Sequence, residues 1–137
     1  MKNILVTGAA GQIGSELVPA LRDSFGSDQV VAAAHSTALP DDINLSGPTT
    51  TIDVTDYLDL EKAIIDFRID RIFHMGSILS ATAENRRESA HQVNINGTFN
   101  ILECAHRHSL EMVILPSSIA AFGAQSPQNM TPNDTIQ

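Results

Sequence analysis

The 137-residue sequence has too few cysteines for two common kinds of structural site. It contains one cysteine, Cys104, so it can form neither an internal disulfide nor a zinc site built from several thiolates. Cys104 lies at helical spacing within residues 100–105, which predicts a small, buried, apolar side chain. A chain this poor in thiols suits a reducing compartment.

Basic residues are also scarce. Lys2 and Lys62 are the only lysines, and the 8 Lys and Arg residues are outnumbered by 16 Asp and Glu, which leaves a net charge of -8 at pH 7. Nucleic acids and anionic membrane surfaces both attract clustered positive charge. The sequence therefore argues against a nucleic-acid partner, and we expect its acidic excess to lie on a solvated surface.

Long apolar runs are missing as well. No segment approaches the roughly 18 consecutive apolar residues of a membrane span. The first residues lead directly into a short apolar strand and show neither a signal peptide nor an Arg-rich leader. We therefore expect a cytoplasmic protein with no membrane partner.

The sequence does contain short apolar runs that alternate with amphipathic stretches. With 42% hydrophobic and 18% charged residues, it has the composition of an ordinary globular domain. Strands are predicted at residues 4–6, 30–34, 49–52, 71–75 and 112–115, and helices at 13–25, 57–67 and 85–108. We expect Asp56 to cap the second helix, Pro19 to end or bend the first, and residues 36–48 and 77–84 to be loops.

The most specific feature is a glycine loop, the segment from Val6 to Gly14, which follows the first strand and opens the first helix. This context is the one that a dinucleotide-binding fingerprint requires. Gly8 permits a tight turn, Gly11 lets the backbone approach a pyrophosphate, and Gly14 lets the helix pack against the strand. The helix amides, starting near Gln12 and Ile13, would then face the diphosphate. A flexible loop without a ligand is the alternative.

The alternation of strands and helices after such a loop predicts the fold class. Parallel strands need crossover helices, which cover both faces of the sheet. We therefore predict an α/β fold, a Rossmann-type doubly wound parallel sheet, with residues 1–137 forming one NAD-binding domain.

The spacing Gly-x-x-Gly-x-x-Gly resembles that of the extended short-chain dehydrogenase/reductase family, the NAD-dependent epimerases and dehydratases. Four further segments resemble family motifs in the same order along the chain: Ile52–Val54, His74–Ser77, Val93–Thr98 and Pro116–Gly123. The resemblance implies NAD as the cofactor. It places Asp53 and Val54 at the adenine, Asn94 beside the cofactor and active site, and three residues along the nicotinamide riboside: Met75, Gly76 and Ser77.

Within this family, the segments 11–19, 76–81 and 93–102 are most similar to the short-chain L-threonine 3-dehydrogenases. The resemblance implies NAD-dependent oxidation of L-threonine, a small-molecule substrate, to 2-amino-3-oxobutyrate. Ser118 would hydrogen-bond the reacting oxygen as the catalytic hydroxyl, and Ser80 and Ser117 would contact the substrate. A sugar-nucleotide epimerase or dehydratase is the alternative enzyme.

The sequence departs from the family at two positions. NAD-dependent members place an acidic residue at the end of the second strand to hold the adenosine ribose, and Ala34 stands there instead. No arginine stands there to accept a 2′-phosphate either, so we expect NAD, bound with weakened affinity. His35 could contact the ribose or be solvated. Phe122 stands where many relatives have tyrosine.

The proton-accepting pair of the family, a tyrosine and a lysine four residues later, does not occur in this chain. Tyr57 is the only tyrosine, and Glu61 follows it at that spacing. By family spacing the tyrosine would fall just beyond Gln137. We therefore expect the 137 residues to supply the cofactor-binding part of a longer enzyme, a homodimer when full length, and to be inactive and prone to association alone. A non-catalytic NAD-binding remnant is the alternative.

Overall fold

A five-stranded parallel sheet forms the centre of the computed structural model, which describes residues 2–118, 122 and 127. The strand order is β3-β2-β1-β4-β5, and every neighbouring pair is parallel. The strands are β1 (Asn3–Thr7), β2 (Val30–Ala34), β3 (Thr49–Thr51), β4 (Ile69–His74) and β5 (Met112–Ile114). This order confirms the predicted Rossmann-type doubly wound sheet. Our interpretations of residues 119–121, 123–126 and 128–137 lie outside the described residues.

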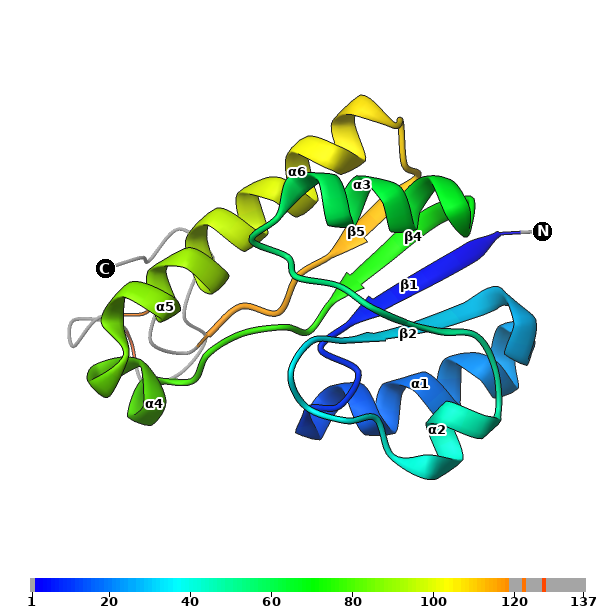
Figure 1. Cartoon of the computed structure of the whole chain (residues 1–137), viewed down its shortest axis with the longest axis horizontal. Helices are drawn as coiled ribbons and strands as arrows, with labels where there is room; N and C mark the ends of the chain where they lie inside the picture. Colours follow the sequence, from blue (N-terminus) through cyan, green and yellow to red (C-terminus); the bar gives the residue numbers. More distant parts are fainter. Residues whose placement is uncertain (1, 119–121, 123–126, 128–137) are drawn as a thin grey trace.

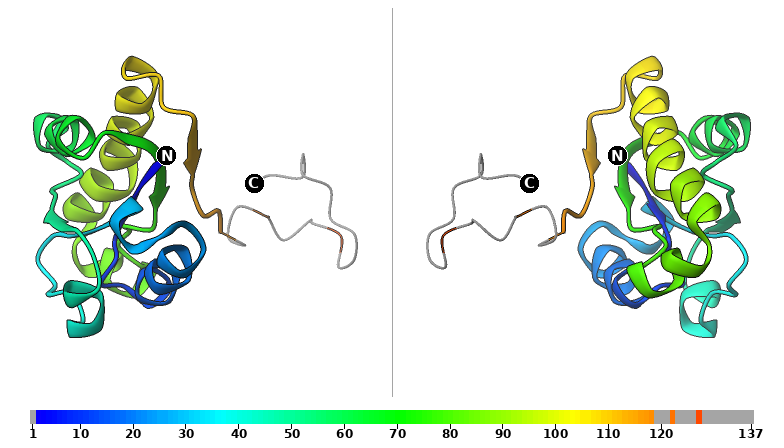
Figure 2. Two further views of the ribbon diagram at one scale, coloured as in Figure 1. Left: turned by 90° about the vertical axis from the view of Figure 1, so that its right-hand side faces the viewer. Right: turned by 90° about the vertical axis from the view of Figure 1, so that its left-hand side faces the viewer.

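Helices cover both faces of the sheet (Figures 1 and 2). One face carries α1 (Gln12–Phe25) and α2 (Asp41–Leu45), with a 3₁₀ turn, η1 (Ser27–Gln29), between α1 and β2. The other face carries α3 (Tyr57–Asp66) and α6 (Thr98–Arg107), and α6 is preceded by α4 (Ser80–Asn85), α5 (Arg87–His91) and a π-helical turn, η2 (Gln92–Gly97). Within the part of the chain that the structure describes, no helix is long and apolar enough to cross a membrane.

The central strand β1 supplies side chains to two separate cores. Leu5 packs with residues of α3 and α6, among them Leu60 and the fully buried Cys104. Ile4 and Val6 point to the opposite face and pack with residues of α1 and α2. Successive strand residues face opposite sides, so a strand covered on both faces must be apolar throughout. The continuous apolar run of β1 follows from this position at the middle of the sheet.

Several predicted elements differ in detail. The cap is confirmed, because the Asp56 side chain accepts hydrogen bonds from the amides of Leu58 and Asp59. However, α1 runs through Pro19 without ending, because burial of its apolar face outweighs the hydrogen bond that proline removes. The two segments expected to be loops contain α2 and α4. In α2, two aspartates in the first turn favour the helix, and the buried Ile43 anchors it.

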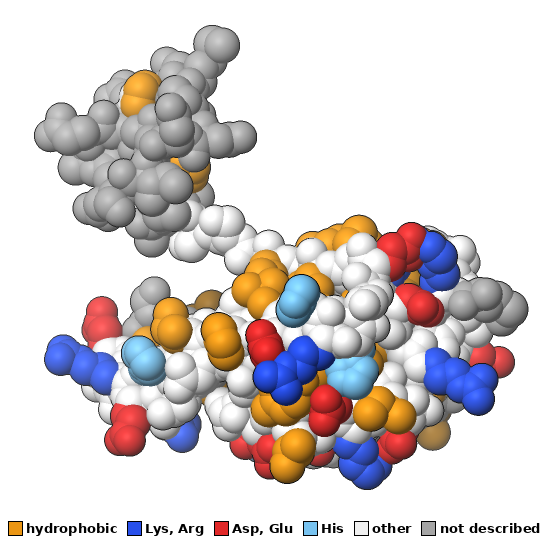
Figure 3. Space-filling view, turned by 90° about the horizontal axis from the view of Figure 1, so that it is seen from above, with side chains coloured by type: hydrophobic (Ala, Val, Ile, Leu, Met, Phe, Trp, Pro, Cys, Tyr) orange, Lys and Arg blue, Asp and Glu red, His pale blue; other side chains and the backbone are white. Residues whose placement is uncertain are grey.

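The predicted long helix at 85–108 is divided by η2. A Cβ on Gly97 would lie 2.8 Å from Cγ2 of Val54, so the glycine allows this turn to approach the segment after β3. Large apolar residues also stay exposed, and Phe99 is exposed by 64%. Figure 3 shows hydrophobic side chains at the surface of one face of the molecule. Such side chains favour association of the chain, which stays a prediction.

One charged side chain, Arg22 of α1, is almost entirely buried, with 4% of its surface exposed. Its guanidinium donates to the carbonyl oxygens of Val30, Ile43 and Pro48, at 2.5 to 3.3 Å, and to the Ser46 hydroxyl at 2.7 Å. Burial lowers the pKa of Arg22 from its usual value. Arg22 therefore ties the segment from α2 to β3 onto α1 and β2.

We predict that Arg22→Met lowers the free energy of unfolding by about 2–4 kcal/mol, because several buried carbonyl groups lose a charged donor. Urea titration followed by circular dichroism measures the change. The matched control is Arg107→Met, since Arg107 is exposed and pairs with Glu103 and the face of Tyr57. The control should lose less than about 1 kcal/mol, and equal losses would contradict the role of Arg22.

Candidate functional site

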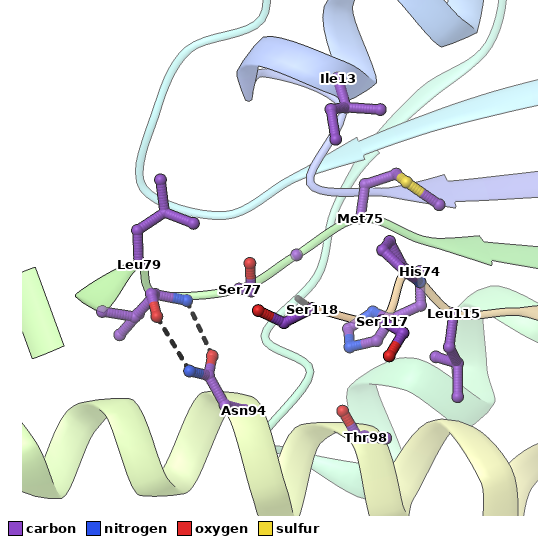
Figure 4. Close-up of a pocket in the computed structure, with 13 residues that line it drawn as sticks. Ile13, His74, Met75, Ser77, Leu79, Asn94, Thr98, Leu115, Ser117 and Ser118 are labelled. Carbon is purple, nitrogen blue, oxygen red and sulfur yellow. Dashed lines mark hydrogen bonds between the residues drawn. The ribbon is translucent and has the colours of Figure 1, made fainter. Parts of the chain in front are cut away.

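The candidate site lies where the carboxyl ends of β1 and β4 meet. From this edge the chain after β1 continues into α1 on one face, and the chain after β4 leads to the helices of the other face. Open parallel sheets bind ligands at such a switch point. A recess of about 500 Å³ opens here (Figure 4). Its lining comes from the start of α1, the end of β4, η2, α6 and the segment after β5: Ile13, His74–Leu79, Asn94, Thr98 and Leu115–Ser118.

The glycine loop packs against its surroundings by backbone alone. Gly8 has a φ of +68°, and a Cβ there would lie 2.6 Å from the backbone nitrogen of Gly76. A Cβ on Gly14 would lie 2.2 Å from the carbonyl oxygen of Gly8. Both positions therefore exclude a side chain. At Gly11 a Cβ would lie 3.2 Å from the carbonyl oxygen of Gly8, a tight contact that a shift of a few tenths of an ångström would relieve.

The loop leaves the amino end of α1 open to a ligand. Gly11 is the N-cap and has no side chain to bond the first amides of the helix. Gln12 and Ile13, the first helical residues, are exposed. The helix is 14 residues long, so its dipole and its unpaired amides favour an anionic group at this end. This geometry suits a phosphate.

Asp53 and Val54, which follow β3, are held in place by neighbouring helices. The Asp53 carboxylate accepts hydrogen bonds from the Thr55 hydroxyl at 2.7 Å and from its amide at 2.9 Å. The hydroxyl donor is the main reason that the pKa of Asp53 is lowered. The Asn100 side chain of α6 donates to the carbonyl of Val54 at 3.0 Å. This pair is therefore a rigid, anionic rim next to the end of β2.

The segment after β4 is fixed by Asn94. The Asn94 carboxamide accepts from the Ile78 amide at 2.8 Å and donates to the Ile78 carbonyl at 2.9 Å. Asn94 therefore lines the recess, but both ends of its carboxamide are already bonded to backbone. Met75, Gly76 and Ser77 lie between this clamp and β4 and line the same recess (Figure 4).

The candidate catalytic hydroxyls come from the segment after β5. Ser117 and Ser118 both line the recess, and Figure 4 shows them near His74 and across from Asn94. Ser80 is the first residue of α4, and its side chain lies outside the described part of the structure. The structure thus brings Ser117 and Ser118 to the glycine loop and to the predicted nicotinamide segment.

Two polar residues at the strand ends, Thr7 and His74, lie within the predicted motif segments but were given no role of their own. Thr7 and His74 are register partners on β1 and β4, and Thr7 Oγ1 lies 2.6 Å from His74 Nδ1. Both side chains are buried, and burial lowers the pKa of His74 to about 4. Thr98, at the start of α6, adds a third unpredicted polar group to the recess. For Thr7 and His74 the sequence did contain a signal. Both are polar residues at the ends of apolar strands predicted to be parallel, where side chains from different strands meet.

The end of β2 forms a second, separate recess of about 630 Å³ lined by Ala34, His35 and residues of α2 and β3. His35 is exposed, and its Nε2 lies 3.8 Å from the Asp53 carboxylate. A carboxylate, that of Asp53, therefore lies next to the end of β2 although position 34 carries none. This observation keeps His35 as a candidate ribose contact.

Tyr57 does not supply a catalytic base to the recess. It packs against the core on the α3 and α6 side, its hydroxyl donates to Glu61 at 3.1 Å, and Arg107 lies 5.4 Å from its ring centre. Desolvation is the main cause that raises the pKa of Tyr57 to about 12. A tyrosine acting as a base needs the opposite shift, so Tyr57 is a packing residue, as expected.

Comparison with known proteins agrees with this geometry. The model of the NAD dependent epimerase/dehydratase family matches residues 4–136. An uncharacterized epimerase/dehydratase from Staphylococcus aureus is 42% identical over 137 residues, which are 100% of this chain and 42% of the relative. The chain therefore spans less than half the length of the curated relatives that it matches.

Solved structures show the same likeness. L-threonine dehydrogenase from Clostridium difficile has a TM-score of 0.91 and 43% identity, covering 100% of this chain and 43% of that one. UDP-glucose 4-epimerase from Thermus thermophilus, in complex with NAD, has a TM-score of 0.80 and 24% identity, covering 98% of this chain and 43% of that one. The second likeness shows the shared fold alone.

We predict that Gly11→Val weakens NADH binding at least about tenfold, or 1.4 kcal/mol, because its side chain would occupy the space of a diphosphate. Its thermal melt should change much less than that of Gly14→Ala, since a Cβ at position 11 would lie 3.2 Å from the Gly8 carbonyl oxygen and one at position 14 would lie 2.2 Å from it. Gly14→Ala should instead fold poorly. NADH fluorescence and circular dichroism measure the two effects, and unchanged binding by Gly11→Val would contradict the assigned loop.

Proposed function

The chain belongs to the NAD-dependent epimerase/dehydratase family, and we propose that it supplies the NAD-binding part of an oxidoreductase that converts L-threonine to 2-amino-3-oxobutyrate. One observation carries the reaction type: Ser117 and Ser118 share a recess with the glycine loop and the end of β4. The 43% identity to an L-threonine dehydrogenase over the whole chain supports this substrate.

The residues present fit a dinucleotide. The open amino end of α1 suits a diphosphate, and the absence of a side chain at Gly11 leaves room for its approach. Asp53 and His35 offer polar contacts on the β2 and β3 side, and the recess beside β4 offers space for the other half. When bound, NAD supplies the acceptor for the hydride that leaves the alcohol carbon.

The role of Ser118 is to hold the reacting oxygen. A hydroxyl can donate a hydrogen bond to the alcohol oxygen and to the carbonyl oxygen that it becomes. The proton of the alcohol must go to a base, and the single tyrosine of this chain has a raised pKa and does not line the recess. We therefore propose that the 137 residues bind NAD but do not catalyse the reaction alone.

A sugar-nucleotide substrate is the alternative within the same family. The family description and the names of the relatives from Staphylococcus aureus both point to epimerase or dehydratase chemistry. Those relatives are described as uncharacterized, and the likeness to UDP-glucose 4-epimerase is at 24% identity. L-Threonine is therefore the better-supported substrate.

We predict that the protein extended to the length of its relatives reduces NAD with L-threonine, measured as absorbance at 340 nm. It should not epimerise UDP-glucose, which is measured by chromatography of the nucleotide sugars because epimerisation leaves no net NADH. Ser118→Ala should lower turnover by about 10²–10³, the typical effect of losing one positioned donor. Ser117→Ala is the matched control, because it removes a neighbouring hydroxyl from the same segment, and its loss should be smaller. Activity with the nucleotide sugar alone would overturn the substrate.

We also predict that Ala34→Asp tightens NAD binding by about 1–2 kcal/mol, because its carboxylate can accept hydrogen bonds from the adenosine ribose hydroxyls. Thr51→Asp is the matched control: Thr51 is the register partner of Ala34 on β3, so the variant adds the same charge one strand away. Isothermal titration measures both variants. Equal gains would show a general charge effect and contradict a ribose contact at position 34.

A further inference from the structure

The His74 ring nitrogen Nε2 is a buried polar atom without a hydrogen-bond partner in the described part of the chain. The side chain is 4% exposed, and the other ring nitrogen, Nδ1, is bonded to Thr7. Leaving a buried polar group unpaired is costly, so native proteins rarely do so without a functional reason. The bond to Thr7 accounts for Nδ1, but no contact within the described residues accounts for Nε2.

The surroundings of Thr7 determine which nitrogen carries the proton. Thr7 is 2% exposed, and within the described residues its hydroxyl has one side-chain partner, His74 Nδ1. If the hydroxyl donates to Nδ1, the proton resides on Nε2 and one buried group lacks a partner. If Nδ1–H donates instead, both the hydroxyl proton and Nε2 lack partners. The first arrangement leaves fewer unpaired groups, so Nε2 carries the proton.

His74 is at the wall of the recess, where its Nε2 atom is covered by neighbouring groups. His74 lines it, and Figure 4 shows the ring beside Ser117, with Thr98 facing the same space from α6. Burial holds the pKa of the ring at about 4, so the imidazole is neutral near pH 7. A neutral N–H suits an uncharged oxygen, a hydroxyl or an amide carbonyl, rather than requiring a phosphate or carboxylate.

The position of His74 selects which half of a dinucleotide it meets. In this fold the residue at the end of β2, here Ala34, lies at the adenosine ribose. The diphosphate binds at the start of α1, after β1. Because β2 and β4 flank β1 on opposite sides, the half that reaches β4 is the one that carries nicotinamide.

We propose that His74 Nε2–H donates a hydrogen bond to an uncharged oxygen of the nicotinamide riboside, and that Thr7 holds the ring in the tautomer and orientation that this bond needs. The proposal rests on the dinucleotide function proposed above. It gives the buried pair at the strand ends a binding role. It also assigns Thr7, the residue directly before Gly8, the separate task of fixing the orientation and tautomer of the ring.

The first test is nuclear magnetic resonance of the chain labelled with ¹⁵N-histidine, comparing additions of ADP, NAD and L-threonine. We expect the free protein to show His74 protonated at Nε2 alone. ADP should bind and leave the His74 signals unchanged, whereas NAD should shift the Nε2 proton. An Nδ1-protonated ring, or a shift caused by ADP or by L-threonine alone, would overturn the proposal. If neither ADP nor NAD binds, the dinucleotide function itself fails.

The second test uses two variants that each replace one of the two ring nitrogens of His74. The Asn side chain reaches only the position of Nδ1, next to Thr7. The Gln side chain reaches the position of Nε2 and can place an amide donor there. His74→Asn should weaken NAD binding about threefold to tenfold, the worth of one neutral hydrogen bond, and leave ADP binding unchanged. His74→Gln should retain most of the NAD affinity. Equal losses for ADP and NAD, or no loss with His74→Asn, would overturn the role of Nε2.

Discussion

Direct backbone contact around the glycine loop is the constraint on which the rest of the structure depends. The start of α1 lies so close to Gly8 that a Cβ on Gly14 would be 2.2 Å from the Gly8 carbonyl oxygen, and a Cβ on Gly8 would be 2.6 Å from the backbone nitrogen of Gly76. These contacts place the amino end of α1 at the carboxyl ends of β1 and β4. The anion-favouring helix end and the recess beside β4 are therefore adjacent because Gly8 and Gly14 pack without side chains.

Side-chain clamps then hold the loops that border this edge. Asn94 bonds both backbone groups of Ile78, Asn100 bonds the carbonyl of Val54, and Arg22 bonds three carbonyls from β2 to β3. Each clamp originates on a helix and acts on an irregular segment whose backbone groups would otherwise lack partners. Loops fixed in this way present their polar groups to a ligand at low entropic cost.

The two sides of the site differ in how completely they are built. The β4 side has a buried histidine, a clamped loop, and hydroxyl residues from α6 and from the segments after β4 and β5, all around one recess. The β2 side lacks the acidic strand end and has the exposed His35 and a partly exposed Asp53 instead. Affinity for a dinucleotide would thus depend more on the diphosphate and the nicotinamide half than on the adenosine.

The sequence by itself determined where the five strands occur along the chain, the glycine loop and the Asp56 cap. These features depend on local spacing and on residues a few positions apart. Tertiary structure alone decided the pairing of Thr7 with His74, the engagement of Asn94 and the burial of Arg22. The first pair is separated by 67 residues and meets only through the parallel register of β1 and β4. Helices α2 and α4 and the π-helical turn likewise depend on neighbours distant in sequence, such as Val54 against Gly97. Local periodicity carries no information about such contacts, because the register of parallel strands is set by the packing of the whole sheet.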